Sequence, residues 1–216
     1  MNRWLEALQR RFRRRRMRRF ARELAISAET RVLDIGGTPG CWDLVPVRPR
    51  LVLLNTPRAG EELAGAACWV AGDGRALPFR DGSFDVVFSN SVIEHVGDRA
   101  SQRRFAREVA RVGRAWWVET PNRWFPIEQH LLTPLVHWLP RAWQRWIVPR
   151  STVWSALARV TPDRRRFYLE HYLAEVRLVD ARELRDLFPR ARLIRERFCG
   201  WTKSLVAVKG PGAQPY

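Results

Sequence analysis

The chain has 216 residues, of which 46% are hydrophobic and 28% charged, a composition typical of a globular protein that can bury one sizeable core. Its formal net charge is +17, and almost all of its basic residues are arginines. Ten arginines lie in residues 1–22, where Glu6 is the only acid. Such a positive field attracts polyanions, either an anionic membrane or a nucleic acid.

Three widely spaced cysteines without a CxxC pair argue against a disulfide framework and a zinc site, and they suit a reducing cytosol. No apolar stretch reaches the roughly 20 residues of a membrane-spanning helix. We therefore expect a cytoplasmic protein, with contact to the inner face of a membrane as a secondary hypothesis.

The predicted elements begin with a basic amphipathic helix within residues 1–25, in which apolar side chains recur every three to four or eight residues between arginines. Short apolar strands then alternate with helices. The expected strands are Arg31–Ile35, Leu51–Asn55, Cys68–Ala71, Phe84–Asn90 and Ala115–Glu119, and the clearest helix is Arg99–Arg111. Such alternation predicts a parallel sheet covered on both faces.

The last part of the chain, after a helix expected at Ala181–Leu187, holds two apolar runs, Arg192–Arg197 and Ser204–Val208. The link between them is too short for a crossover helix, so these strands should pair antiparallel. The predicted fold is α/β: a Rossmann-like, seven-stranded, mostly parallel sheet with a C-terminal antiparallel hairpin and helices on both faces. It occupies residues 26–210, and residues 211–216 form a tail.

Residues 121–160 interrupt the alternation with several prolines and six tryptophan and phenylalanine residues, which include Trp124, Trp143 and Trp146. We interpret them as an insertion of short helices over the carboxyl edge of the sheet. The segment is either a lid that packs on the domain or an interfacial surface whose tryptophans meet lipid headgroups.

The strongest local motif is VLDIGGTPG at residues 32–40, an apolar strand that opens directly into a glycine-rich turn. Such a turn lets the backbone approach a ligand closely, and the following helix offers free N–H groups to anionic groups. Ligands of such sheets bind beyond the carboxyl ends of the strands.

This motif resembles the first motif of class I methyltransferases. The resemblance continues in GDGRALP at residues 72–78 and DGSFDVVFSNSVIEHV at residues 81–96, and covers about residues 30–120. The order of these pieces is similar to that in the small-molecule methyltransferases typified by ubiquinone and menaquinone biosynthesis enzymes. It implies S-adenosylmethionine as cofactor.

Carried over residue by residue, the resemblance places three groups around the cofactor. The residues that would border its methionine end are Asp34, Gly36, Thr38 and Gly40, with Asn90 and Ser91 beneath it. Asp73 would accept a hydrogen bond from the adenine amino group, with Gly74 and Arg75 beside the ring. Two positions depart from the family: Thr38 replaces a glycine, and Asn55 replaces the acid that holds the ribose hydroxyls, so its amide binds without charge assistance.

Methyl transfer needs a general base only when the acceptor atom carries a proton to be lost. His95, just after the fourth strand, and His130, in the insertion, are the candidates, with Glu94 and Glu128 nearby. A metal site is not expected, because no histidine pair has ligand-like spacing with a nearby acid or cysteine.

The resemblance implies an S-adenosylmethionine-dependent methyltransferase that acts at oxygen or carbon of a small-molecule or lipid-like acceptor. The alternatives are an RNA methyltransferase, which the charge favours, and a non-catalytic module that binds the cofactor without turnover. Nucleic acid ranks below membrane as a partner because tryptophan clusters suit a lipid better than a phosphate track.

Overall fold

The computed structural model describes residues 3–57, 68–148, 150, 166, 169–170, 172–173 and 175–210. These residues form a seven-stranded sheet in the order β3-β2-β1-β4-β5-β9-β8. The parallel strands are β1 (Arg31–Ile35), β2 (Arg50–Asn55), β3 (Trp69–Ala71), β4 (Phe84–Asn90) and β5 (Gly113–Pro121). The sheet confirms the predicted Rossmann-like fold class.

The C-terminal hairpin consists of β8 (Arg192–Phe198) and β9 (Trp201–Lys209), and β9 pairs antiparallel with both β5 and β8. Its turn is only Cys199–Gly200, and both residues have positive φ (47° and 81°), a conformation typical of two-residue hairpin turns. The strands therefore extend further toward the turn than predicted.

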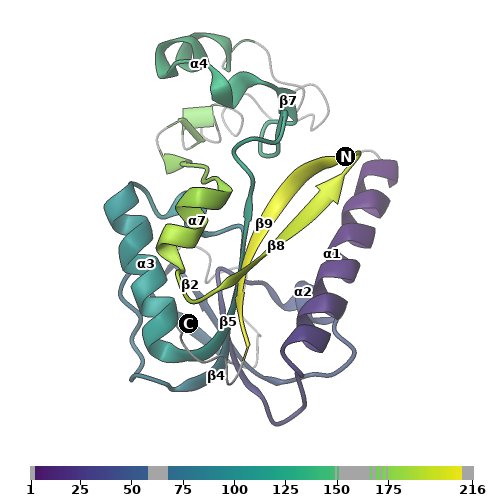
Figure 1. Cartoon of the computed structure of the whole chain (residues 1–216), viewed down its shortest axis with the longest axis vertical. Coiled ribbons are helices and arrows are strands. Elements are labelled where there is room, and N and C mark those ends of the chain that lie inside the picture. Colours follow the sequence, from purple (N-terminus) through teal and green to yellow (C-terminus); the bar gives the residue numbers. More distant parts are fainter. Residues whose placement is uncertain are drawn as a thin grey trace.

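Helices cover both faces of the sheet (Figure 1). On one face lie α3 (Arg99–Val112) and α7 (Ala181–Leu187), and on the other α1 (Arg3–Glu23) and α2 (Pro39–Trp42). Asp98 caps α3 by accepting from the Ser101 N–H, and Asp180 with Glu183 forms a capping box on α7. These caps fix where two helices begin, close to the carboxyl edge of the sheet.

The basic helix α1 packs its apolar side chains into the core. Met17, Phe20 and Leu24 are buried, and the Phe20 ring makes edge contacts with Trp42, Phe88 and Trp117. Among the described side chains of α1, the apolar ones therefore pack against the sheet. Arg11 and Arg14 lie on the opposite, exposed face of the helix.

The insertion after β5 lies beyond the carboxyl end of that strand (Figure 1). It differs from the expected run of short helices, because it opens with a two-stranded hairpin of β6 (Ile127–Glu128) and β7 (Thr133–Pro134). The short 3-10 helix η3 (Val136–Trp138) and α4 (Arg141–Ile147) follow. Residues 149 and 151–160 of the predicted insertion lie outside the described residues. No helix among those described is long and apolar enough to cross a membrane.

Candidate functional site

A cavity of about 440 Å³ opens at the carboxyl ends of β1 and β2. It has the size of a small-molecule site. Its lining comes from the ends of these strands, the turn after β3, the segment after β4 and one residue near α7: Ile35, Gly36, Leu54, Asn55, Thr56, Gly72, Asp73, Gly74, Arg75, Val92, His95, Val96, Gly97 and Glu175. This is the edge at which ligands of open α/β sheets bind.

The glycine-rich turn after β1 depends on two glycines. Gly36 has a φ of +75°, and a Cβ there would lie 2.5 Å from Val92 Cγ2. A Cβ on Gly37 would lie 1.6 Å from the carboxylate of Asp34. The bare backbone at these positions lets the chain fold over Asp34 and leaves space in the cavity.

Asp34 lies beneath the turn instead of in the cavity wall. Its side chain is buried, and Oδ2 accepts a hydrogen bond from Trp42 Nε1 at 2.8 Å. Oδ1 has no hydrogen-bond partner among the described residues. Burial raises the pKa of this carboxyl to about 7. Asp34 would therefore affect ligand binding indirectly, by holding the glycine-rich turn in its conformation.

Two polar side chains connect the neighbouring turns with the cavity. Asn55 donates from Nδ2 to the Gly37 carbonyl at 2.7 Å, which joins the end of β2 to the glycine-rich turn. Asp73 accepts from the Arg75 backbone N–H at 2.8 Å and pairs with the Arg75 guanidinium at 2.6 Å. Hydrogen bonds from Arg75 lower the pKa of Asp73, so this carboxylate stays ionised beside the cavity.

Besides Asp34, the structure places four more of the predicted cofactor residues outside the cavity lining. Thr38 and Gly40 lie at and within the start of α2. Asn90 accepts from Arg16 Nη1 at 2.5 Å, and Ser91, whose φ is +57°, donates from Oγ to Glu119 at 2.9 Å. Their contact with a cofactor remains a prediction.

The sequence did not predict the partly buried polar cluster that contacts Asn90 and Ser91. The Arg16 guanidinium lies 2.8 Å from Glu119 Oε1 and 2.5 Å from Glu196 Oε2. Because its partners come from β4, β5 and β8, this side chain of α1 joins the basic helix to the sheet. No local pattern distinguishes this arginine from its neighbours in the run Arg13–Arg16.

The two candidate bases contact each other, and one of them, His95, lines the cavity. His95 and His130, 35 residues apart, approach to 3.1 Å between their Nε2 atoms. His130 Nδ1 lies 2.7 Å from Glu128 Oε1. Although burial alone lowers the pKa of His130, the Glu128 carboxylate raises it above its ordinary value.

Glu94 completes this histidine cluster. Its side chain is fully buried, Oε2 accepts from Thr120 Oγ1 at 3.0 Å, and Oε1 lies 4.0 Å from His130 Nε2. Burial raises the pKa of Glu94 to about 7. From the sequence, Glu94 was expected only to lie near His95.

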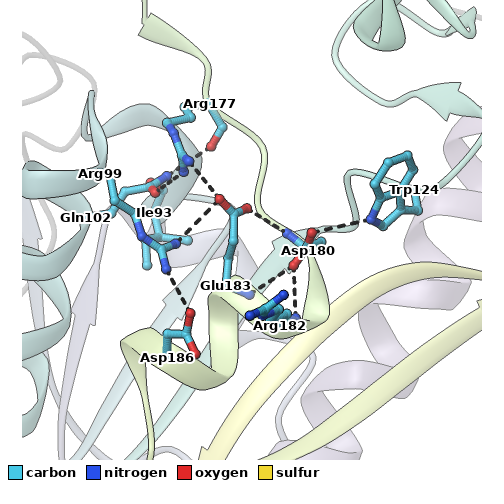
Figure 2. A network of polar contacts seen from close by, with 9 residues as sticks. All are labelled: Ile93, Arg99, Gln102, Trp124, Arg177, Asp180, Arg182, Glu183 and Asp186. Carbon is cyan, nitrogen blue, oxygen red and sulfur yellow. Dashed lines mark hydrogen bonds and ion pairs between the residues drawn. The ribbon is translucent and has the colours of Figure 1, made fainter.

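A polar network holds the 3-10 helix η2 (Ile93–His95) in place (Figure 2). Gln102 of α3 donates to the carbonyls of Ile93 and Arg177, at 3.1 and 2.9 Å. Arg177 in turn donates to Gln102 Oε1 and to Glu183 of α7, both at 2.7 Å. The network thereby fixes Glu94 and His95 from both neighbouring helices.

The same network reaches the insertion. Trp124 Nε1 donates to Asp180 at 3.4 Å, next to the capping box of α7 (Figure 2). This hydrogen bond joins the start of the insertion to the residue that caps α7.

Part of the chain is similar to known methyltransferases. Residues 48–115 match the family described as a methyltransferase domain. With the observed strand order, this match makes the chain similar to class I methyltransferases over that part of its length. A curated protein of Mycobacterium sp. (strain KMS), named an uncharacterized methyltransferase, is 39% identical over 89 residues, which cover 38% of this chain and 34% of that relative. The matched part thus spans about a third of the relative's length.

Two solved structures share the fold of this chain. One is a putative methyltransferase in complex with the Haloferax volcanii Trm112 methyltransferase activator, with a TM-score of 0.54, 14% identity and coverage of 92% of this chain and 89% of that chain. The other, from Rhodobacter sphaeroides, is titled a putative zinc-dependent alcohol dehydrogenase, with a TM-score of 0.55, 14% identity and coverage of 85% and 84%. At this identity the likeness concerns the fold alone.

The part of the chain that matches the methyltransferase family includes most of the cavity lining. Asn55, Asp73–Arg75 and His95 lie within residues 48–115, whereas Gly36 precedes them and Glu175 follows them. Glu175 was missed because it reaches the cavity from a segment without a recognisable motif.

Proposed function

We propose that the protein binds S-adenosylmethionine in the cavity at the carboxyl ends of β1 and β2 and transfers its methyl group to oxygen or carbon of a small-molecule or lipid-like acceptor. The observation that supports this most directly is the cavity itself, which joins the Gly36 turn, Asn55 and the Asp73 carboxylate at one edge of the sheet. The methyltransferase domain match supports the reaction class.

The residues present fit this cofactor. A Cβ on Gly36 would lie 2.5 Å from Val92 Cγ2, a side chain that also lines the cavity, so this glycine keeps the backbone close to the space that the cofactor would fill. A Cβ on Gly74 would instead lie 2.9 Å from the core side chain Phe105, so this glycine allows the turn after β3 to pack on the core. Asp73 would accept from the adenine amino group, and the Asn55 amide would bind the ribose hydroxyls. When bound, the cofactor supplies an already electrophilic methyl carbon.

The contribution of the protein would then be mainly positioning and exclusion of water. His95 lines the cavity, and His130 of the insertion contacts His95 from outside the lining. An acceptor that enters below the insertion would meet this histidine cluster first. Whether its reactive atom is a hydroxyl or a carbon decides whether a proton must be removed.

The experiment that tests cofactor binding is calorimetric titration with S-adenosylhomocysteine, the demethylated product. Asp73→Asn removes one charge-assisted acceptor, so we expect affinity to fall about 10-fold to 100-fold. Asp81→Asn is the matched control, because Asp81 is exposed and pairs with Arg111 away from the cavity. Equal affinities of the two variants would contradict the assignment of Asp73, and a folded wild-type protein that ignores the compound would contradict the function.

We propose further that the acceptor is met at an anionic membrane surface on the cytoplasmic side. Arg11, Arg14, Arg15, Arg18 and Arg22 lie along the outer face of α1, where the described residues form no ion pair with them. On α4, Trp143 and Trp146 are 61% and 60% exposed. Arginines that meet phosphates and tryptophans at headgroup level support this proposal.

A further inference from the structure

We propose that Glu94, His95 and His130 form a binding site for one divalent transition-metal ion at the wall of the cavity. Their ligand atoms lie within 4.8 Å of one another. The sequence predicted no metal site because spacing along the chain was the criterion, and His130 approaches from the insertion. Two imidazoles and one carboxylate favour zinc, cobalt, iron or manganese over magnesium and calcium.

The two histidines have the separation that a shared ion requires. Their Nε2 atoms lie 3.1 Å apart. An ion about 2.05 Å from each nitrogen would subtend an angle of about 100° between them, close to the ideal for tetrahedral or octahedral coordination. The side chains therefore need little movement to bind one ion together.

Glu94 offers the third ligand atom. Its Oε1 is buried without a hydrogen-bond partner among the described residues, and it lies 4.0 Å from His130 Nε2. Ligand atoms of one ion usually lie about 3–4 Å apart, so this oxygen is at the upper end of that range and a small shift of the carboxylate completes the set. A bound ion would coordinate this buried carboxylate oxygen and so compensate for its missing hydrogen bond.

Glu128 supplies the outer support that metal-binding histidines typically have. It lies 2.7 Å from His130 Nδ1, and its other oxygen accepts from the Leu131 N–H at 2.6 Å. This carboxylate favours the tautomer that carries its proton on Nδ1, which leaves Nε2 of His130 able to bind an ion. Carboxylate, histidine and metal in this order form a recurrent arrangement.

The site would have an open side, because His95 lines the cavity. An ion there could bind an oxygen atom of a second molecule in the cavity and favour its deprotonated form. This role rests on the proposed methyl transfer, whereas the metal site rests only on the four side chains.

The test uses the full chain, freed of metal by dialysis against a chelator and titrated with Co²⁺, whose visible absorption reports its ligands. We expect saturation at one ion per chain, displacement by Zn²⁺ and no thiolate charge-transfer band, which separates this site from Cys41, Cys68 and Cys199. His130→Ala should weaken binding at least 100-fold, and Glu128→Gln about 10-fold to 100-fold. His137→Ala is the control, since His137 lies in the same insertion and contacts the Arg123 carbonyl.

Failure of the wild-type protein to bind Co²⁺ at this stoichiometry would overturn the proposal, as would binding that His95→Ala and His130→Ala leave unchanged. Each variant is also titrated with S-adenosylhomocysteine and melted, so that loss of fold is separated from loss of a ligand. Cofactor binding without Co²⁺ binding overturns the metal site alone. Co²⁺ binding without cofactor binding supports the metal site and contradicts the proposed function.

Discussion

At the scale of single residues, Asp34 shows how the turn after β1 constrains the chemistry beneath it. The glycine-rich backbone closes over a carboxyl that has one hydrogen bond, from Trp42, and is otherwise buried. Burial raises its pKa from 3.8 to about 7, which corresponds to a free-energy cost of ionisation on the order of 4 kcal/mol. The stability contributed by the protonated form is fully present below about pH 4 and is lost as the pH rises to about 7.

Asp34→Asn should therefore gain stability relative to the wild-type protein between about pH 4 and pH 7, by on the order of 4 kcal/mol, and no further above that range. Urea unfolding of both proteins at several pH values measures the difference. Asp85→Asn is a control of opposite sign, because hydrogen bonds from Arg31 lower the pKa of Asp85 to about 2. A pH-independent difference between Asp34→Asn and the wild-type protein would contradict the burial argument.

Single residues also show which contacts a sequence motif can predict and which it cannot. Gly36, Asn55 and Asp73 line the cavity as expected, because strand ends and tight turns fix where those residues lie. Asn90 does not, since Arg16, 74 residues away, binds its side chain. A contact of this kind depends on how a distant helix packs, and the sequence carries no local trace of it.

At the scale of elements, the apolar strands were the most predictable and the insertion the least. Arg31–Ile35 and Phe84–Asn90 have the predicted bounds, because a buried strand between turn residues leaves little choice of register. The hairpin of β6 and β7 was missed, since each strand has only two residues and shows no period. Because His130 lies in the turn of this hairpin, its contact with His95 was not predicted either.

The docking of α1 depends on Arg16, which joins Glu119 and Glu196 in a part of the protein with little solvent access. Arg16→Met leaves the buried Glu119 carboxylate without its cation, so we expect the free energy of unfolding to fall by about 3–5 kcal/mol. Arg14→Met, on the exposed face of the same helix, should change it by less than about 0.5 kcal/mol. Urea unfolding followed by circular dichroism measures both, and equal losses would contradict the role of Arg16.

A second substitution tests the electrostatic reason for that loss. In the double variant Arg16→Met/Glu119→Gln the uncompensated charge is gone, so part of the lost stability should return. A double variant less stable than the single one would show instead that Arg16 acts through packing of its side-chain stem.

At the scale of the whole molecule, the exposed arginines and the exposed tryptophans lie on different helices, α1 and α4. The apolar side of α1 packs on the sheet through Met17 and Phe20, so its outer face presents arginine without a matching apolar stripe. Membrane contact through this helix would then be electrostatic, with insertion left to exposed tryptophans such as Trp143. The two contributions differ in their response to salt.

Replacement of Arg14, Arg18 and Arg22 by glutamine removes three charges from one face of α1. Each arginine near an anionic surface contributes about 1 kcal/mol, so binding to phosphatidylserine vesicles should weaken about 100-fold, measured by sedimentation at low salt. The control replaces Arg103, Arg107 and Arg190, which are exposed elsewhere and give the same net charge. Binding that ignores salt, or that both triple variants weaken equally, would contradict a defined basic face. Salt-sensitive binding to RNA but not to these vesicles would instead assign the face to nucleic acid, because a phosphate track needs the same charges without the tryptophans.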